Sequence, residues 1–483
     1  MRKLIGRSTI FVLAEFLQMG ASFFLLPLYT SRLSTADYGI IALTTTLSGV
    51  FGILLMQSSE GMFNRYYYIC TDEDKRKSFY GATWPVFSFY ALAICLLIDL
   101  LGKTFGERIF PGVPYQPYLQ FTLWTAFLKV TTFSLPRAIF LAREAAWSYA
   151  SITISSFFIS TVLIIYFVAV RNEGALGNVR GAFFGALVVA IPSIIITLRN
   201  IKPNWNWQHL RTGLVFALPI TPHLLSTWAL NLADRFVLQQ FVPLSDIGIY
   251  AFGYQVASIV QVIAYSIATA LSPYFLKTAT DNPNAPAILS RMATYYIAVV
   301  VWGGLGMIAL SGSGIKLVAL RPEYYAALAV IPWVVAGSVV RGYYFIFLDA
   351  VYFSKNLRVL PMVTFGAALG NIVLNLLLVP QIGYIAAAIT TLLCFAAQAV
   401  VMGVAAQRLY WLPYEWRRLV IVTLMGLIWA VLLSMFTLPN IWLDLVIKGV
   451  LALAFPLLLG LIGFFSRDEI DKLLTLRPLR TNQ

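Results

Sequence analysis

The chain has 483 residues, of which 60% are hydrophobic and only 11% are charged, and its mean hydropathy is +0.80. A water-soluble protein cannot bury that much apolar surface, which excludes an ordinary soluble enzyme and predicts an all-α integral membrane protein. The formal net charge of +14 would suggest nucleic acid as the partner of a soluble protein, but here we expect basic loops on one side of a membrane and no nucleic acid.

Apolar runs predict about fourteen transmembrane helices, since roughly 20 apolar residues cross about 30 Å of hydrocarbon. The first run carries Glu15 and lacks a small-residue cleavage site, so we interpret it as a helix of the mature protein. The longest connection is the segment 57–79, so function is expected inside the helix bundle. The predicted helices cover residues 8–29, 39–57, 80–101, 118–141, 148–170, 181–198, 213–238, 247–272, 292–311, 325–347, 359–379, 384–407, 418–437 and 443–465.

The distribution of basic residues predicts the orientation in the membrane. With a cytoplasmic N-terminus, 23 of the 34 Lys and Arg residues fall on the cytoplasmic side and 8, Lys448 among them, on the opposite side. The other three, Lys129, Arg235 and Arg341, lie within spans. By the positive-inside rule, both termini are expected to be cytoplasmic. The three cysteines favour neither a disulfide framework nor a metal cluster, and no cofactor is expected.

Two matches at one offset indicate an internal repeat. The pattern D-x-G-I-x-A occurs at residues 37–42 and again at 246–251, an offset of 209 residues, and the same offset relates Gly174 and Gly177 to Gly383 and Ala386. A repeat unit of six helices gives both halves the same orientation. We therefore expect an N-terminal six-helix lobe at residues 1–207, a C-terminal six-helix lobe at 208–410, and two extra transmembrane helices with a cytoplasmic tail at 411–483.

Four stretches carry a resemblance to a known family. They are RLSTADYG at residues 32–39, NLADRFVL at 231–238, DIGIY at 246–250, and NIVLNLLLVP at 371–380 with a glycine three residues further on. With these stretches, the chain resembles the polysaccharide-exporting branch, the O-antigen-type flippases, of the multidrug/oligosaccharidyl-lipid/polysaccharide exporter superfamily. It departs from the family pattern at Ala386, where a second glycine is usual.

The resemblance implies a function in polysaccharide biosynthesis at the bacterial inner membrane. A family member of this kind has two six-helix lobes around a central cavity. By alternating access, it moves an undecaprenyl-diphosphate-linked oligosaccharide from the cytoplasmic to the periplasmic leaflet. The resemblance also implies association with the polymerase and ligase of the same pathway.

Lys129 and Arg341 are the main candidates for binding the diphosphate of such a lipid. A charge at mid-membrane is costly, so it is normally directed into the bundle interior and marks a functional site. The repeat offset sends Lys129 to Ser338, three residues from Arg341, so the two charges are expected on matching faces toward one cavity. The planar fork of arginine suits a phosphate. The alternatives are a Lys129 that reaches an interface and a structural pair of Arg341 with Asp349.

Further candidates lie nearer the ends of the helices. Arg65, beside three tyrosines at the cytoplasmic mouth, and Tyr344, on the cytoplasmic side of Arg341, are substrate-binding candidates. Asp234 and Arg235 most simply attach their helix to a neighbour. Arg235 is nevertheless retained as a substrate-binding candidate. The ion-coupling candidates are Asp234, Glu15 and Asp349.

Two other functions are alternatives. A cation-coupled multidrug or small-molecule exporter of the same superfamily would share the fold and the repeat, but cationic drugs favour an acidic cavity, whereas Lys129 and Arg341 are basic. A membrane glycosyltransferase or polymerase would need a sizeable extramembrane loop with catalytic groups, and the sequence has no His-Glu-x-x-His or paired-acid motif. An enzyme is therefore not expected.

Overall fold

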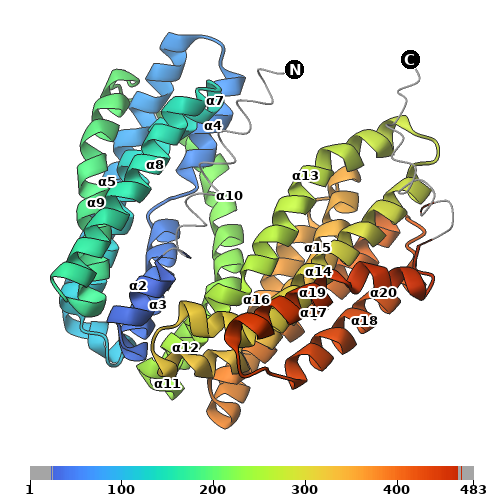
Figure 1. Ribbon diagram of the computed structural model, residues 1–483. Helices are drawn as coiled ribbons and strands as arrows, with labels where there is room; N and C mark the ends of the chain where they lie inside the picture. The colour runs from blue at the N-terminus through green and yellow to red at the C-terminus, as the bar shows by residue number, and fades with distance from the viewer. Residues whose placement is uncertain (1–22, 24, 466–468, 470–483) are drawn as a thin grey trace. The chain divides into compact units, whose positions relative to one another are not determined.

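The computed structural model describes residues 23, 25–465 and 469, and every regular element among them is a helix (Figure 1). These residues form two compact units. The first unit holds the described residues up to Phe252, together with Ala319–Tyr324 and Thr364–Thr390. The second unit holds Gly253–Val318, Tyr325–Val363 and the described residues from Thr391. The three-part division into residues 1–207, 208–410 and 411–483 stays a prediction.

The predicted all-α membrane fold is confirmed, with an approximate number of spans. Twelve helices among the described residues are long and apolar enough to cross a membrane. The predicted helix 118–141 is not one of them; it consists of two α-helical segments with a π-helical turn at residues 129–133 between them. The predicted helix 8–29 lies largely outside the described residues.

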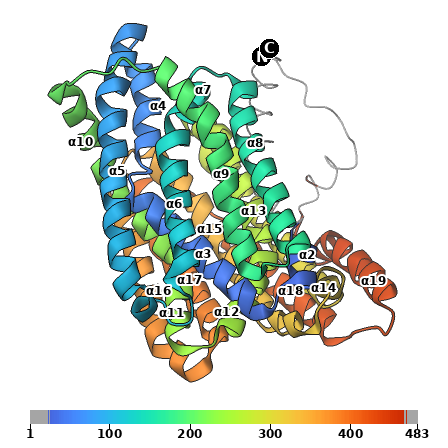
Figure 2. The ribbon, with the colours of Figure 1, turned by 90° about the vertical axis from the view of Figure 1, so that its left-hand side faces the viewer.

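The helices of the first unit include several broken ones. Figure 2 shows α8 and α9, which pack along one another, from the side. The helices are α2 Leu26–Arg32, α3 Thr35–Leu54, α4 Ser59–Ile69, α5 Glu73–Ile109, the π-helical η1 Tyr115–Leu119, α6 Gln120–Leu128, the π-helical η2 Lys129–Phe133, α7 Ser134–Ala142, α8 Ala146–Ile165, the π-helical η3 Tyr166–Val170, α9 Gly174–Arg199, α10 Trp207–Leu232, α11 Asp234–Phe241 and most of α12 Leu244–Ala257.

The predicted connection 57–79 is largely helical, which corrects the sequence interpretation. It contains α4 and the first turns of α5, with only residues 70–72 between the two helices. Asp72 caps α5, since its Oδ1 accepts hydrogen bonds from the backbone N–H of Asp74 at 2.8 Å and of Lys75 at 3.2 Å. The prediction was wrong here because charged and polar residues interrupt the apolar run, although they do not prevent a helix.

The second sequence match of the repeat has a conformational basis. Gly174 is the first residue of α9, and Gly383 directly precedes α17 Tyr384–Leu409. Their φ angles are +60° and +75°. Only glycine takes this left-handed conformation without steric cost. The same glycine therefore recurs because the same turn recurs.

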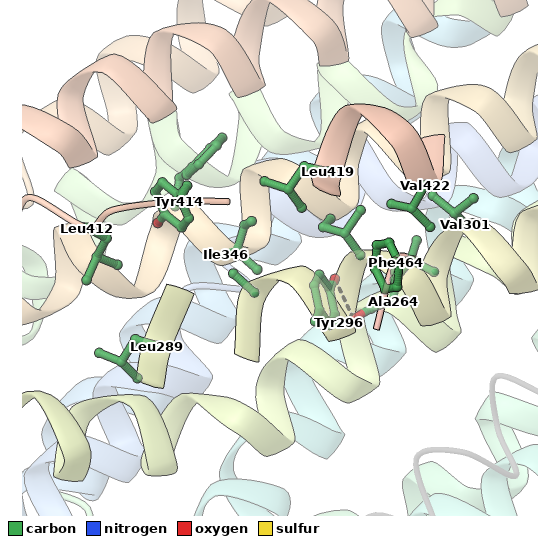
Figure 3. Close-up of a cluster of buried hydrophobic side chains, with 14 of the residues drawn as sticks. Ala264, Leu289, Tyr296, Val301, Ile346, Leu412, Tyr414, Leu419, Val422 and Phe464 are labelled. Atoms are coloured by element: carbon green, nitrogen blue, oxygen red, sulfur yellow. Dashed lines mark hydrogen bonds between the residues drawn. The ribbon is translucent and has the colours of Figure 1, made fainter. Parts of the chain in front are cut away.

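The second unit has its core around α14 Ala285–Val318, which packs against its neighbours α13, α15, α18 and α19. Figure 3 shows part of this core, to which Leu419 and Val422 of α18 and Val301 of α14 belong. The other helices of this unit are α13 Ile259–Asp281, most of the 3-10 helix η4 Pro322–Ala329, α15 Ile331–Phe353, most of α17, α18 Trp416–Met435, α19 Ile441–Leu453 and α20 Phe455–Leu461. Most of α16 Val359–Ile382 belongs to the first unit.

Lys448 lies inside this core and not at a membrane surface as predicted. Its Nζ lies 3.2 Å from Asp444 Oδ2, and both side chains are at most 2% exposed. Ser313 Oγ of α14 also donates a hydrogen bond to Asp444 Oδ2 at 2.7 Å. The lysine is tolerated there because the carboxylate one helical turn earlier neutralises it.

Candidate functional site

A polar cavity lies inside the first unit, between α3, α4, α7, α8 and the turn η2. We call it the Lys129 cavity; its volume is about 360 Å³. Hydroxyl groups of α7 and α8 contribute to its wall, which is as polar as it is apolar. Its polar lining includes Gln57, Glu60, Lys129, Ser134, Arg137 and Ser156.

The π-helical turn η2 places Lys129 on the cavity wall. Thr131 and Thr132 donate their hydroxyls to backbone carbonyls four residues earlier, at 2.7 and 2.8 Å, and Trp84 Nε1 of α5 donates to Thr131 O at 2.7 Å. Pro136 follows within the first turn of α7, where its missing N–H is tolerated. The chain thus stays helical from α6 to α7 with a π-helical turn between them, and π-helical turns are frequent at functional sites.

The cavity carries a net positive charge from its described lining residues. Arg137 Nε lies 3.3 Å from Glu60 Oε1, and its Nη2 donates a hydrogen bond to Tyr149 Oη at 2.9 Å. These contacts fix the guanidinium between α4 and α8. Lys129 has neither an ion pair nor a hydrogen bond to any residue that the structure describes, and its side chain is exposed to the cavity. Its ammonium is therefore available to a ligand.

Arg65 belongs to a second hollow of the first unit. This arginine groove, of about 700 Å³, runs between α4, α5 and α10 and is lined by Arg65, Arg211, Gln208, Tyr66, Phe79 and Phe216. The Arg65 guanidinium lies 4.9 Å from the centre of the Phe216 ring. Glu60 and Arg65 lie on the same helix, so α4 contributes to both the Lys129 cavity and the arginine groove.

Asp234 and Arg235 bind each other at the start of α11. Arg235 Nη1 lies 3.0 Å from Asp234 Oδ1, and both side chains are less than a tenth exposed. Tyr250 of α12 donates a hydrogen bond to Asp234 Oδ2, and its ring lies 5.5 Å from the Arg235 guanidinium. This arrangement is the attachment to a neighbouring helix that the sequence favoured.

Arg341, Tyr344 and Asp349 all lie on α15 in the second unit. The Arg341 guanidinium is half-buried, 4.5 Å from the centre of the Phe395 ring, and Tyr344 packs edge-on against the ring of Phe345. Asp349 accepts a hydrogen bond from Ser272 Oγ at 2.6 Å. Asp349 forms no ion pair within the part of the chain that the structure describes, so the alternative pair with Arg341 is not found there.

Sequence reasoning missed Glu60, Arg137 and Arg211 as site residues and placed Glu60 in a loop. The sequence of α4 contained a signal for these residues, because its length and its polar residues are typical of a helix that faces a polar interior. Glu15, the remaining ion-coupling candidate, lies outside the described residues.

Comparisons with known proteins agree with this architecture. Residues 6–279 match the family described as "Polysaccharide biosynthesis protein". The chain is 22% identical, over 62% of its length and 72% of the relative, to "Lsg locus putative protein 1" of Haemophilus influenzae.

Two solved structures share the fold. The lipid II flippase MurJ in an inward closed conformation is 17% identical, with a TM-score of 0.77 over 96% of this chain and 100% of that one. An inward-facing multidrug resistance MATE family transporter of the MOP superfamily is 11% identical, with a TM-score of 0.62 over 86% of this chain and 95% of that one. The family match over residues 6–279 confirms the resemblance, and the two solved structures show that the fold is shared.

Proposed function

The chain belongs to the polysaccharide biosynthesis protein family, a membrane transport family, and from this premise we propose that it is a flippase for an undecaprenyl-diphosphate-linked oligosaccharide. The substrate moves from the cytoplasmic to the periplasmic leaflet of the bacterial inner membrane by alternating access. Both termini are cytoplasmic. A polymerase and a ligase that use the translocated glycan are the expected partners.

The Lys129 cavity is the observation that carries the proposal. Moving a diphosphate and sugars through hydrocarbon requires groups that replace their hydration, because unpaired buried charge is costly. Lys129 supplies an ammonium that has no partner among the described residues, and serine hydroxyls on the same wall suit sugar hydroxyls. Arg137 is already held by Glu60 and Tyr149, so we assign it to shaping the cavity.

The size and charge of the cavity both favour this substrate class over the alternatives. A volume of about 360 Å³ lies at the lower end of ligand pockets and suits the diphosphate end of the headgroup, without the rest of the oligosaccharide or the lipid tail. A net positive lining disfavours cationic drugs, which makes the cation-coupled exporter the weaker reading. Arg65 and Arg211 give the arginine groove the same sign of charge, so we propose that it also attracts the phosphates.

The test is flipping by the purified protein in liposomes that contain a fluorescent undecaprenyl-diphosphate oligosaccharide. We expect Lys129→Ala to lower the initial rate at least tenfold, about 1.4 kcal/mol. Lys129→Arg should retain part of the rate because the charge is kept. Lys277→Ala, which removes an exposed lysine of α13, is the matched control.

Wild-type rates for Lys129→Ala at equal protein amounts would contradict the role of this cavity. Transport of a cationic dye in the same liposomes, without flipping of the lipid, would favour the exporter.

A further inference from the structure

Asp349 lies at a small cavity in the second unit, separate from the Lys129 cavity. The cavity has a volume of about 10 Å³, the space of a single water molecule, and is otherwise lined mainly by apolar side chains. Leu289, Ile346 and Leu412, which are labelled in Figure 3, belong to this lining. Asp349 itself is 8% exposed. A carboxyl group therefore faces a water-sized space inside a hydrophobic core.

Tyr414 lines the same cavity, and its buried hydroxyl has no hydrogen-bond partner among the described residues. Tyr414 is only 7% exposed and lies in the connector between α17 and α18. Unsatisfied buried hydroxyls are costly and usually mark a bound water or ligand. The carboxyl and the hydroxyl thus converge on one space from different elements.

Among the described residues, no cation forms an ion pair with Asp349. The titratable groups that face it are tyrosines: Tyr296 from α14, Tyr414 from the connector and Tyr352 one turn further along α15. From α13 it receives only the hydroxyl of Ser272. No Lys, Arg, His or second acidic residue is among the described residues that line the cavity.

Two other buried aspartates of the chain show which partners stabilise an ionised carboxylate in this protein. Asp234 has Arg235 at 3.0 Å, and Asp444 has Lys448 at 3.2 Å together with Ser313 and a backbone N–H. Without such a cation, a buried carboxyl takes up a proton instead of remaining charged. Asp349 differs from both in just this respect.

We propose that Asp349 is a proton-binding site completed by one water molecule. A proton from the aqueous phase forms an O–H bond on Oδ2, while Oδ1 continues to accept the hydrogen bond from Ser272. The new O–H donates to a water in the cavity, and that water is bonded to the Tyr414 hydroxyl. In the protonated state, a hydrogen bond that Asp349 donates thereby links α13 and α15 through the water to the connector between α17 and α18.

A metal cation fits this cavity less well. A hard cation surrounds itself with about six or more oxygens, whereas the polar groups here are one carboxyl and the hydroxyls of serine and tyrosine. The Tyr296 hydroxyl is already used, since it donates to Ala264 O at 3.0 Å (Figure 3). We therefore assign the site to a proton.

Infrared difference spectroscopy of the full-length protein in lipid nanodiscs tests the assignment. The carbonyl stretch of a protonated carboxyl should be present near neutral pH and should be lost in Asp349→Asn. Tyr414→Phe keeps the carboxyl and should shift this band without removing it. Tyr274→Phe, which alters an exposed tyrosine of α13 outside the cavity lining, is the matched control and should leave it unchanged.

Proton binding gives a second readout if Asp349→Asn folds poorly. Between acidic and alkaline pH the wild type should release about one more proton per molecule than Asp349→Asn, and Tyr414→Phe should release its proton at a lower pH than the wild type. Identical bands and proton release in wild type and Asp349→Asn would overturn the proposal. A stabilisation by Na⁺ over K⁺ that Asp349→Asn abolishes would also overturn it, in favour of a cation site. None of these readouts depends on the transported substrate.

Discussion

Gly39 and Gly248, the glycines of the two D-x-G-I-x-A segments, lie against each other in the first unit. A Cβ atom on Gly39 would lie 3.2 Å from Gly248 N, and a Cβ atom on Gly248 would lie 2.9 Å from Gly39 N. Each would also collide with a carbonyl oxygen of the opposite segment, Leu244 O or Thr35 O. The sequence repeat is therefore a reciprocal contact between α3 and α12, made through the backbones.

This contact predicts a severe effect of the smallest possible substitution. Gly39→Ala and Gly248→Ala must each push two backbones apart, and we expect a loss of at least about 1–3 kcal/mol of stability, the cost of overpacking. The melting temperature of the purified protein measures it. Gly306→Ala in α14 is the control, since nothing lies within 4 Å of its added Cβ. Equal melting temperatures for Gly248→Ala and Gly306→Ala would contradict the close contact.

The Asp234–Arg235 pair should behave as a structural unit. Asp234→Asn leaves a buried guanidinium without its carboxylate and should cost about 3–5 kcal/mol, whereas Asp234→Asn with Arg235→Met should recover much of the loss. Thermal unfolding of the single and double variants measures this coupling. Ion coupling by Asp234 and substrate binding by Arg235 remain predictions. A double variant that is stable but flips no lipid in liposomes would show that at least one of the two residues has such a role.

Arg341 should bind phosphate through its planar fork. We expect Arg341→Ala to insert normally and to abolish export of the polysaccharide in cells, and Arg341→Lys to recover only part of it, because lysine lacks the bidentate contact. Arg358→Ala, in the connector before α16, is a control for loss of a positive charge. Export at the wild-type level by Arg341→Ala, at matched membrane amounts, would exclude this role.

The predicted orientation can be checked with reporter fusions at the breaks between helices. Fusions after Thr71 and Asn204 should be cytoplasmic, and fusions after Gly112 and Arg321 should be periplasmic, because of the bias of basic residues. Phe79 is unsuitable as a fusion point since it is buried within α5. Detection of the Thr71 and Gly112 fusions on the same side of the membrane would show that α5 does not span it.

The sequence by itself determined the membrane class, most of the helices and the repeat, because these depend on local apolar content and on backbone conformations that only glycine adopts. Gly174 and Gly383 could be recognised in this way. Lys129 could be singled out because a charge in an apolar run is costly wherever the run packs.

Only the tertiary structure decided which charges are neutralised. Lys448 and Arg235 are paired and buried, Arg137 is held by Glu60 from another helix, and Lys129 faces a cavity without a partner among the described residues. A helical sequence gives the spacing of residues along one helix, but it does not give the rotation of that helix against its neighbours. If a helix were rotated about its axis by the angle between two successive residues, a charge that is now paired would face a ligand instead. The Lys129 cavity and the Asp349 site therefore had to be found in the structure.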